Sequence, residues 1–144
     1  MTGYLLDVNL LIALAWPNHT QHAAAHRWFA QNQAHGWGTC MVTQLGFVRI
    51  SSHPALPHHV STQAALQKLR QITAMPTHKY WPEPDGGYAN ETFTQTTATT
   101  LTHKLVTDGY LATVAALHGG KLATFDRQCV AAFPDQCALI TANG

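Results

Sequence analysis

Three aspartates stand where apolar segments give way to helical ones, and they are the residues best placed to do chemistry. Asp7 follows the apolar run Tyr4-Leu5-Leu6, Asp126 follows Lys121 to Phe125, and Asp108 begins a helical segment. Carboxylates gathered in a partly dry site repel one another, and a hard divalent cation relieves that repulsion. Such a cation lowers the pKa of bound water and polarises a phosphodiester. The residues therefore point to hydrolysis of a phosphate ester.

The alternative reading of each aspartate is structural. An aspartate at a strand-to-helix junction is commonly an N-cap that stabilises the helix by about 1 kcal/mol. Only seven residues of the 144 are acidic, so the position of each is informative. The other four are expected in solvated loops: Glu83, Asp85, Glu91 and Asp135.

Apolar runs alternate with helical patterns along the whole chain. Strands are predicted at 4–6, 39–42, 78–81, 121–125 and 138–141, and helices at 8–16, 19–33, 44–52, 62–73, 109–118 and 127–133. Thr43 is predicted to cap the helix over 44–52, and Thr107 or Asp108 the helix over 109–118. Continuously apolar strands indicate a mostly parallel sheet covered on both faces, with ligands at the carboxyl ends of the strands.

The segment 82–102 is the least regular. Seven of its last eleven residues are threonine, which disfavours an isolated helix and predicts a loop or a poorly stabilised helix.

Length and composition set broad limits. A chain of 144 residues, 46% hydrophobic, fits one folded domain over 1–144 and excludes a disordered chain. A net charge of +1 excludes a highly basic nucleic-acid coat. Three cysteines without a CxxC pair predict no disulfide framework and favour the cytoplasm. The apolar N-terminus lacks a basic start and is interrupted by Asp7, and no apolar run is long enough for a membrane helix.

Three motifs, in this order, carry a family resemblance: LLDVNLLIALAW, VTQLGFVRISS and VTDGYLATVAALHGGKLATFD. Together they resemble the PIN-domain toxins of the VapC type, from bacterial toxin–antitoxin pairs. The resemblance implies a three-layer α/β/α domain with a mostly parallel sheet. It also implies an endoribonuclease that depends on Mg²⁺ or Mn²⁺, forms homodimers in the cytoplasm and is inhibited by a cognate antitoxin protein.

The resemblance assigns roles to particular residues. Asp7, Asp108 and Asp126 match the catalytic, metal-binding carboxylates, and Thr124 and Asn9 match supporting positions beside them. The family's usual second acid falls at Gln44, which carries no charge. We therefore expect one tightly held Mg²⁺, with any second ion arriving beside the substrate phosphate.

The mechanism implied is in-line attack of water on the scissile phosphorus, leaving a 5′-phosphate. Arg49, Lys104 and Arg127 flank the acidic motifs and are candidates for binding RNA phosphates, although each could be an ordinary surface cation. Selectivity is expected to come from a folded RNA with an exposed single-stranded loop.

Two other functions remain open at this point. A phosphatase of the haloacid-dehalogenase type also begins with an aspartate after an apolar strand, but it needs a second aspartate where Asn9 stands. A PIN module that binds RNA or protein without catalysis is the other alternative, and Gln44 is its best support.

Two groups of side chains are interpreted mainly as structural. His19, His22 and His26 could form a metal-binding face but are more readily a polar helix stripe. Trp16, Trp28, Phe29 and Trp37 are expected mostly in the core; the alternative, which follows from the family resemblance, is that some line a groove for the antitoxin.

Overall fold

The centre of the protein is a five-stranded sheet in which every pair of neighbours is parallel. The computed structural model describes residues 3–98 and 102–142. The strands are β1 (Tyr4–Leu6), β2 (Trp37–Thr39), β3 (His78–Tyr80), β4 (Lys121–Thr124) and β5 (Cys137–Leu139). Their order in the sheet is β3-β2-β1-β4-β5, so β1 and β4, far apart in sequence, lie side by side at its centre. The predicted mostly parallel sheet is confirmed.

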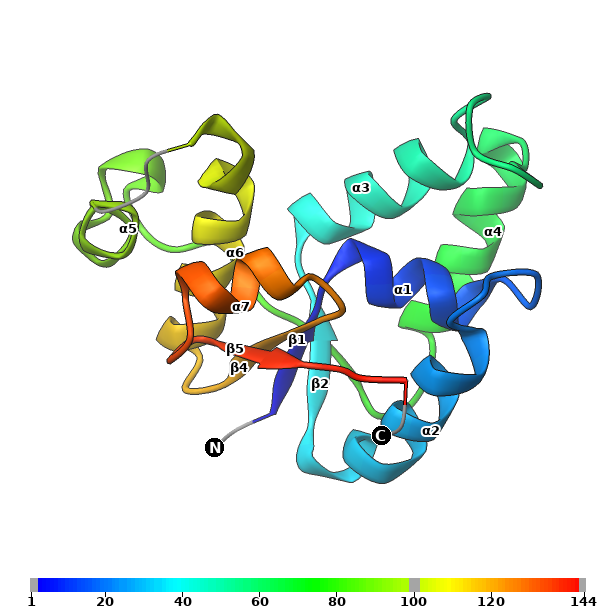
Figure 1. Ribbon diagram of the computed structural model, residues 1–144, viewed down its shortest axis with the longest axis horizontal. Coiled ribbons are helices and arrows are strands. Elements are labelled where there is room, and N and C mark those ends of the chain that lie inside the picture. The colour runs from blue at the N-terminus through cyan, green and yellow to red at the C-terminus, as the bar shows by residue number, and fades with distance from the viewer. Residues whose placement is uncertain (1–2, 99–101, 143–144) are drawn as a thin grey trace.

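Helices cover both faces of this sheet (Figure 1). The α-helices are α1 (Val8–Ala15), α2 (His22–Asn32), α3 (Met41–Ser51), α4 (Thr62–Thr73), α5 (Glu91–Thr97), α6 (Val106–Leu117) and α7 (Arg127–Ala132). Short 3₁₀ turns are η1 (Gln33–His35), η2 (Gly87–Ala89) and η3 (His103–Leu105). The arrangement confirms the predicted three-layer α/β/α class. Within the described residues, no helix has both the length and the apolarity needed to cross a membrane.

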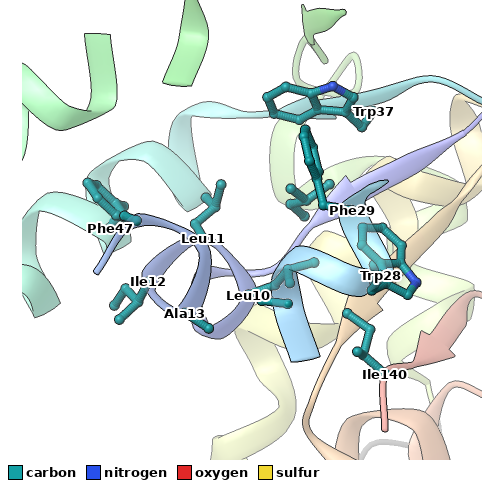
Figure 2. Packing of buried hydrophobic residues seen from close by; sticks show 13 residues of the cluster. Leu10, Leu11, Ile12, Ala13, Trp28, Phe29, Trp37, Phe47 and Ile140 are labelled. Carbon is teal, nitrogen blue, oxygen red and sulfur yellow. The ribbon is translucent and has the colours of Figure 1, made fainter. Parts of the chain in front are cut away.

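Successive side chains of the central strands point to opposite faces of the sheet, and this divides the core into two parts. Leu6 and Ala123 pack with α1 and α2 on one face, whereas Leu5 and Leu122 pack with α6 on the other. Figure 2 shows the first part, where Trp37 and Phe29 meet edge to face with ring centroids 5.0 Å apart. Since both faces are apolar, the strands read as unbroken hydrophobic runs.

The aromatic residues of the first core are mostly buried, as expected. Trp28, Phe29 and Trp37 are each at most 8% exposed. Trp16 is half-buried, donates its indole N–H to Ser51 Oγ at 3.0 Å, and lines a cavity of about 270 Å³.

The predicted start of the helix after β2 is wrong. The strand ends at Thr39 and Cys40 is the N-cap of α3, so Thr43 lies inside the helix. The Thr43 hydroxyl accepts a hydrogen bond from the Cys40 backbone N–H and donates to the Cys40 carbonyl, both at 3.0 Å. These bonds turn the chain into the helix three residues earlier than the sequence pattern predicts.

The start of α6 also differs from the prediction. The helix begins at Val106 because the 3₁₀ turn η3 leads directly into it, and neither Thr107 nor Asp108 is a cap. Asp108 instead lies in the first helical turn, where a negative charge interacts favourably with the helix dipole.

The threonine-rich segment contains a real helix, α5. Asn90 caps it by accepting from the Phe93 N–H at 3.1 Å. Thr94 and Thr97 donate their hydroxyls to carbonyls four residues earlier, so their side chains stay bonded to the helix itself. Glu91, expected in a loop, is the first residue of α5. Part of the predicted irregular segment, residues 99–101, lies outside the described residues.

The histidine stripe on α2 has a structural role. His22 Nδ1 lies 2.7 Å from the Ala13 carbonyl oxygen and His26 Nε2 lies 3.2 Å from that of Leu14. Carbonyls in the last turn of a helix have no intrahelical partner, and these rings satisfy two of them in α1. All three cysteines are free and buried, as the prediction of no disulfide framework requires.

Phe47 on α3 offers a direct test of this packing. It is fully buried and stacks on Trp16 with centroids 6.1 Å apart. We expect Phe47→Ala to lower the free energy of unfolding by about 3–5 kcal/mol, because a large cavity replaces the ring. Urea denaturation followed by circular dichroism measures this. Leu45→Ala, on the same helix but 61% exposed, should change it by less than about 0.5 kcal/mol. Equal losses in the two variants would refute the packing described.

Candidate active site

Asp7 and Asp126 follow the two central strands at their carboxyl ends. The Asp7 backbone N–H donates to the Ala123 carbonyl at 3.0 Å, which continues the β1–β4 pairing to the start of α1. Asp7 is only 7% exposed. Its Oδ1 accepts from the Val8 N–H at 2.8 Å, so the same side chain caps α1. The capping and site interpretations of Asp7 are therefore compatible.

The Thr124 hydroxyl joins the elements of the site. It donates to Asp7 Oδ2 at 2.7 Å and accepts from Asn9 Nδ2 and from the Asp126 backbone N–H, both at 3.0 Å. One donated and two accepted bonds use the full capacity of a hydroxyl. Asn9 completes the connection, because its Oδ1 accepts from the Phe125 N–H at 3.3 Å. The predicted supporting residues thus contact the predicted acids or each other.

Asp126 caps α7 with one oxygen. Its Oδ1 accepts from the N–H groups of Gln128 and Cys129 at 2.8 and 3.3 Å. Within residues 3–98 and 102–142, its Oδ2 takes part in no hydrogen bond, and neither does the Asp108 carboxylate. These oxygens are available to a ligand.

The three carboxylates are near enough for their charges to affect two of their pKa values. Burial raises the pKa of Asp7 most strongly; hydrogen bonds from Thr124 and Val8 lower that pKa in part, and Asp126 raises it. Burial, followed by the charges of Asp7 and Asp126, raises the pKa of Asp108 from 3.8 to about 6. The fold therefore collects negative charge, and in the part of the chain that the structure describes no Lys, Arg or His side chain bonds to these carboxylates.

Gln44 on α3 is held by a buried polar chain. Its Nε2 donates to Thr39 Oγ1 at 3.0 Å, and that hydroxyl lies 2.8 Å from His78 Nε2. Thr39 is fully buried, and burial lowers the pKa of His78, which favours the neutral ring that accepts the hydroxyl proton. Within the described residues, the amide oxygen of Gln44 takes part in no hydrogen bond. Thr39 and His78 are not among the site residues predicted from the sequence, because their contact depends on the pairing of β2 with β3.

The three predicted phosphate-binding cations lie in different places. Arg127 is exposed at the first position of α7, directly after Asp126. A positive charge at the start of a helix interacts unfavourably with the helix dipole, and the cap of α7 is Asp126, not Arg127. Lys104 is exposed in η3, just before α6. Arg49 lies in the last turn of α3, where its charge favours the helix dipole, roughly 7 Å along the axis beyond Gln44. Their contacts with RNA stay predictions.

The donor atoms fit a hard cation. The site offers carboxylate oxygens, which are ligands that Mg²⁺ prefers. Within the described residues, no group of three or more His, Cys, Asp or Glu side chains is arranged to hold an ion alone. Magnesium commonly uses one or two carboxylates and keeps several waters, so this pocket suits a partly hydrated ion.

Comparisons with known proteins give close sequence relatives. The chain is 42% identical to Ribonuclease VapC39 of Mycobacterium tuberculosis, over 85% of the chain and 87% of the relative. It is 37% identical to Ribonuclease VapC38 and 34% identical to Ribonuclease VapC44 of the same organism, each over 85% of the chain and about 85% of the relative. No protein-family model matches the chain.

The fold has a counterpart among solved structures. A chain of FitAcB from Neisseria gonorrhoeae superposes with a TM-score of 0.64 at 17% identity, over 96% of this chain and 97% of the other. The parallel sheet, its two helical layers and the acids at the carboxyl ends of β1 and β4 define a PIN-like domain. With relatives at 34–42% identity along most of its length, the chain belongs to the VapC family of ribonucleases.

The raised pKa of Asp108 predicts a measurable dependence of the free energy of unfolding on pH. Its pKa is raised in the folded state, so the folded protein loses stability as the pH rises from about 4, where the unfolded carboxyl ionises, through about 6. In EDTA at pH 8 we expect Asp108→Asn to raise the free energy of unfolding by about 1 kcal/mol, because half-exposure screens part of the effect. At pH 4 the gain should vanish. Urea titrations at both pH values measure this, and a gain that is equal at both would contradict the explanation.

Proposed function

We propose that this protein is a metal-dependent endoribonuclease, the toxin of a type II toxin–antitoxin pair, which hydrolyses RNA phosphodiester bonds at the acidic pocket. The observation that carries the proposal is the gathering of Asp7, Asp108 and Asp126: beside burial, the charge of Asp126 raises the pKa of Asp7, and the charges of Asp7 and Asp126 raise that of Asp108. Membership of the VapC ribonuclease family supports the same activity.

Each residue of the pocket has a distinct task in this proposal. Asp7 and Asp108 would hold Mg²⁺, or Mn²⁺ in its place, directly or through water, with Asp126 completing the pocket. The ion would polarise the phosphodiester and lower the pKa of a bound water. Thr124 fixes the orientation of Asp7 through the 2.7 Å bond to Oδ2. Arg127, beside Asp126, would bind an RNA phosphate as a charge-assisted contact, with Lys104 and Arg49 farther along the strand.

The phosphatase alternative loses support at Asn9. Both ends of the Asn9 amide are committed, Nδ2 to Thr124 and Oδ1 to the Phe125 N–H. A general acid cannot be provided by this side chain, which has no ionisable proton. The non-catalytic binding module is separated from the nuclease by the first test below.

The partner that we propose is a cognate antitoxin protein. A basic antitoxin side chain inserted among the carboxylates would compete with the metal ion for the same charge, which gives a direct route to inhibition. A homodimer stays a prediction from the family resemblance, and sedimentation equilibrium of the purified protein would measure it.

Cleavage of labelled RNA tests the proposed reaction. We expect cleavage in Mg²⁺ that EDTA abolishes, and a loss of at least about 100-fold in Asp7→Asn, because metal ions contribute several kcal/mol to such transition states. Asp135→Asn is the matched control, since Asp135 is an exposed acid in the turn after α7. RNA cleavage that is unchanged by EDTA and by Asp7→Asn would overturn the mechanism. RNA binding without any cleavage would favour the non-catalytic module.

The number of tightly bound metal ions is a separate prediction. Because Gln44 is neutral, we expect isothermal titration calorimetry to show one tight Mn²⁺ site per chain. Gln44→Glu adds a carboxylate and is expected to strengthen Mn²⁺ binding or create a second site. Two tight sites in the unaltered protein would contradict the single-ion proposal.

A further inference from the structure

A cavity of about 390 Å³ lies beside the first turn of α6 and is unused by the proposed reaction. Its walls come from the loop after β3, η2, α5, α6 and the start of α3. Glu83, Tyr88, Phe93 and Tyr110 are the lining side chains that matter here.

This cavity adjoins the acidic pocket through two helices. Val42, two residues before Gln44, and Thr107, next to Asp108, both line it. Val106 to Tyr110 span about one helical turn, so the cavity and the Asp108 carboxylate share the first turn of α6. Figure 1 shows the η2–α5 segment packed beside α6, on the side away from α1. A strand of RNA cleaved at the acids would pass this opening.

Aromatic side chains give the cavity faces on which a base can stack. The Tyr88 ring is 87% exposed. Phe93 and Tyr110 meet edge to face with centroids 6.0 Å apart, which holds both rings in place. Base–aromatic stacking contributes about 1–3 kcal/mol per base in single-stranded binding.

Glu83 decides which chemistry the cavity accepts. It is the one charged residue lining the cavity, and within the described residues its carboxylate takes part in no hydrogen bond. A carboxylate repels phosphate but accepts hydrogen bonds from base N–H groups. Guanine presents two adjacent donors, N1–H and the N2 amino group, that match two carboxylate oxygens.

We propose that this cavity is a subsite for an unpaired guanine base next to the cleaved bond, with Tyr88 stacking on the base and Glu83 accepting from its Watson–Crick edge. As a substrate subsite, it rests on the proposed RNA-cleaving function.

Direct binding tests the subsite without requiring catalysis. The probes are fluorescein-labelled heptauridylates with guanosine, inosine, adenosine or uridine at the centre, measured by fluorescence anisotropy in Ca²⁺. We expect the guanosine probe to bind about tenfold more tightly than the inosine probe, which lacks the N2 amino donor, because a hydrogen bond to a charged group contributes at least this much. Equal affinities for the four probes would overturn the proposal.

Two variants assign the preference to this cavity. Glu83→Gln should remove the difference between guanosine and inosine, whereas Asp85→Asn, an equal loss of charge in the same loop outside this cavity, should preserve it. Tyr88→Ala should weaken binding of the guanosine probe about tenfold. Equal effects of Glu83→Gln and Asp85→Asn, or unchanged binding by Tyr88→Ala, would refute the subsite and leave the cavity to another ligand, such as an antitoxin side chain.

Cleavage of a randomised RNA pool separates this proposal from the proposed function. Guanine enriched at a fixed distance from the cut, and lost in Glu83→Gln, supports both. Cleavage without such enrichment refutes the subsite alone. Absence of cleavage together with the guanosine preference in binding refutes the nuclease activity alone.

Discussion

The hydrogen bond from Thr124 to Asp7 is the contact on which the site depends. It links the end of β4 to the start of α1, and the same hydroxyl accepts from Asn9 and from the Asp126 backbone. Because all of its bonding capacity is used, the hydroxyl has one orientation, which fixes the buried carboxylate relative to the second acid. The parallel pairing of β1 with β4 brings these groups together, and the helical layers keep water from replacing the bond.

The gathering of carboxylates lowers the stability of the folded protein, and this loss indicates a functional role for the site. Burial raises the pKa of both Asp7 and Asp108, and the neighbouring carboxylates raise both further, which destabilises the charged, metal-free protein near neutral pH. A protein under selection for stability alone would have no reason to gather these charges. A divalent cation would offset the repulsion, so binding and folding would be coupled at this pocket. The neutral Gln44 is held by its bond to Thr39, whose hydroxyl lies beside His78, and it adds no charge to the repulsion among the acids.

Local sequence patterns predicted the order of the strands and helices better than the residues at which they begin and end. The order of strands and helices follows from apolar runs, but α3 starts at Met41 because Thr43 bonds back to Cys40, and α6 starts at Val106 because η3 leads into it. The threonine-rich segment forms α5 because Asn90 caps it and because threonine hydroxyls bond within the helix. Such bonds depend on the path of the backbone, which a propensity argument does not contain.

The sequence alone predicts the kind of chemistry. A chain with seven acids that places three of them at strand and helix ends, within three motifs in a fixed order, already predicts an acidic pocket and a PIN-like fold. Tertiary structure decided which groups touch: the saturated hydroxyl of Thr124, the chain from His78 through Thr39 to Gln44, and the cavity that joins Glu83 to Tyr88. These contacts join residues from different elements, and only the strand order and helix packing set the distances between them.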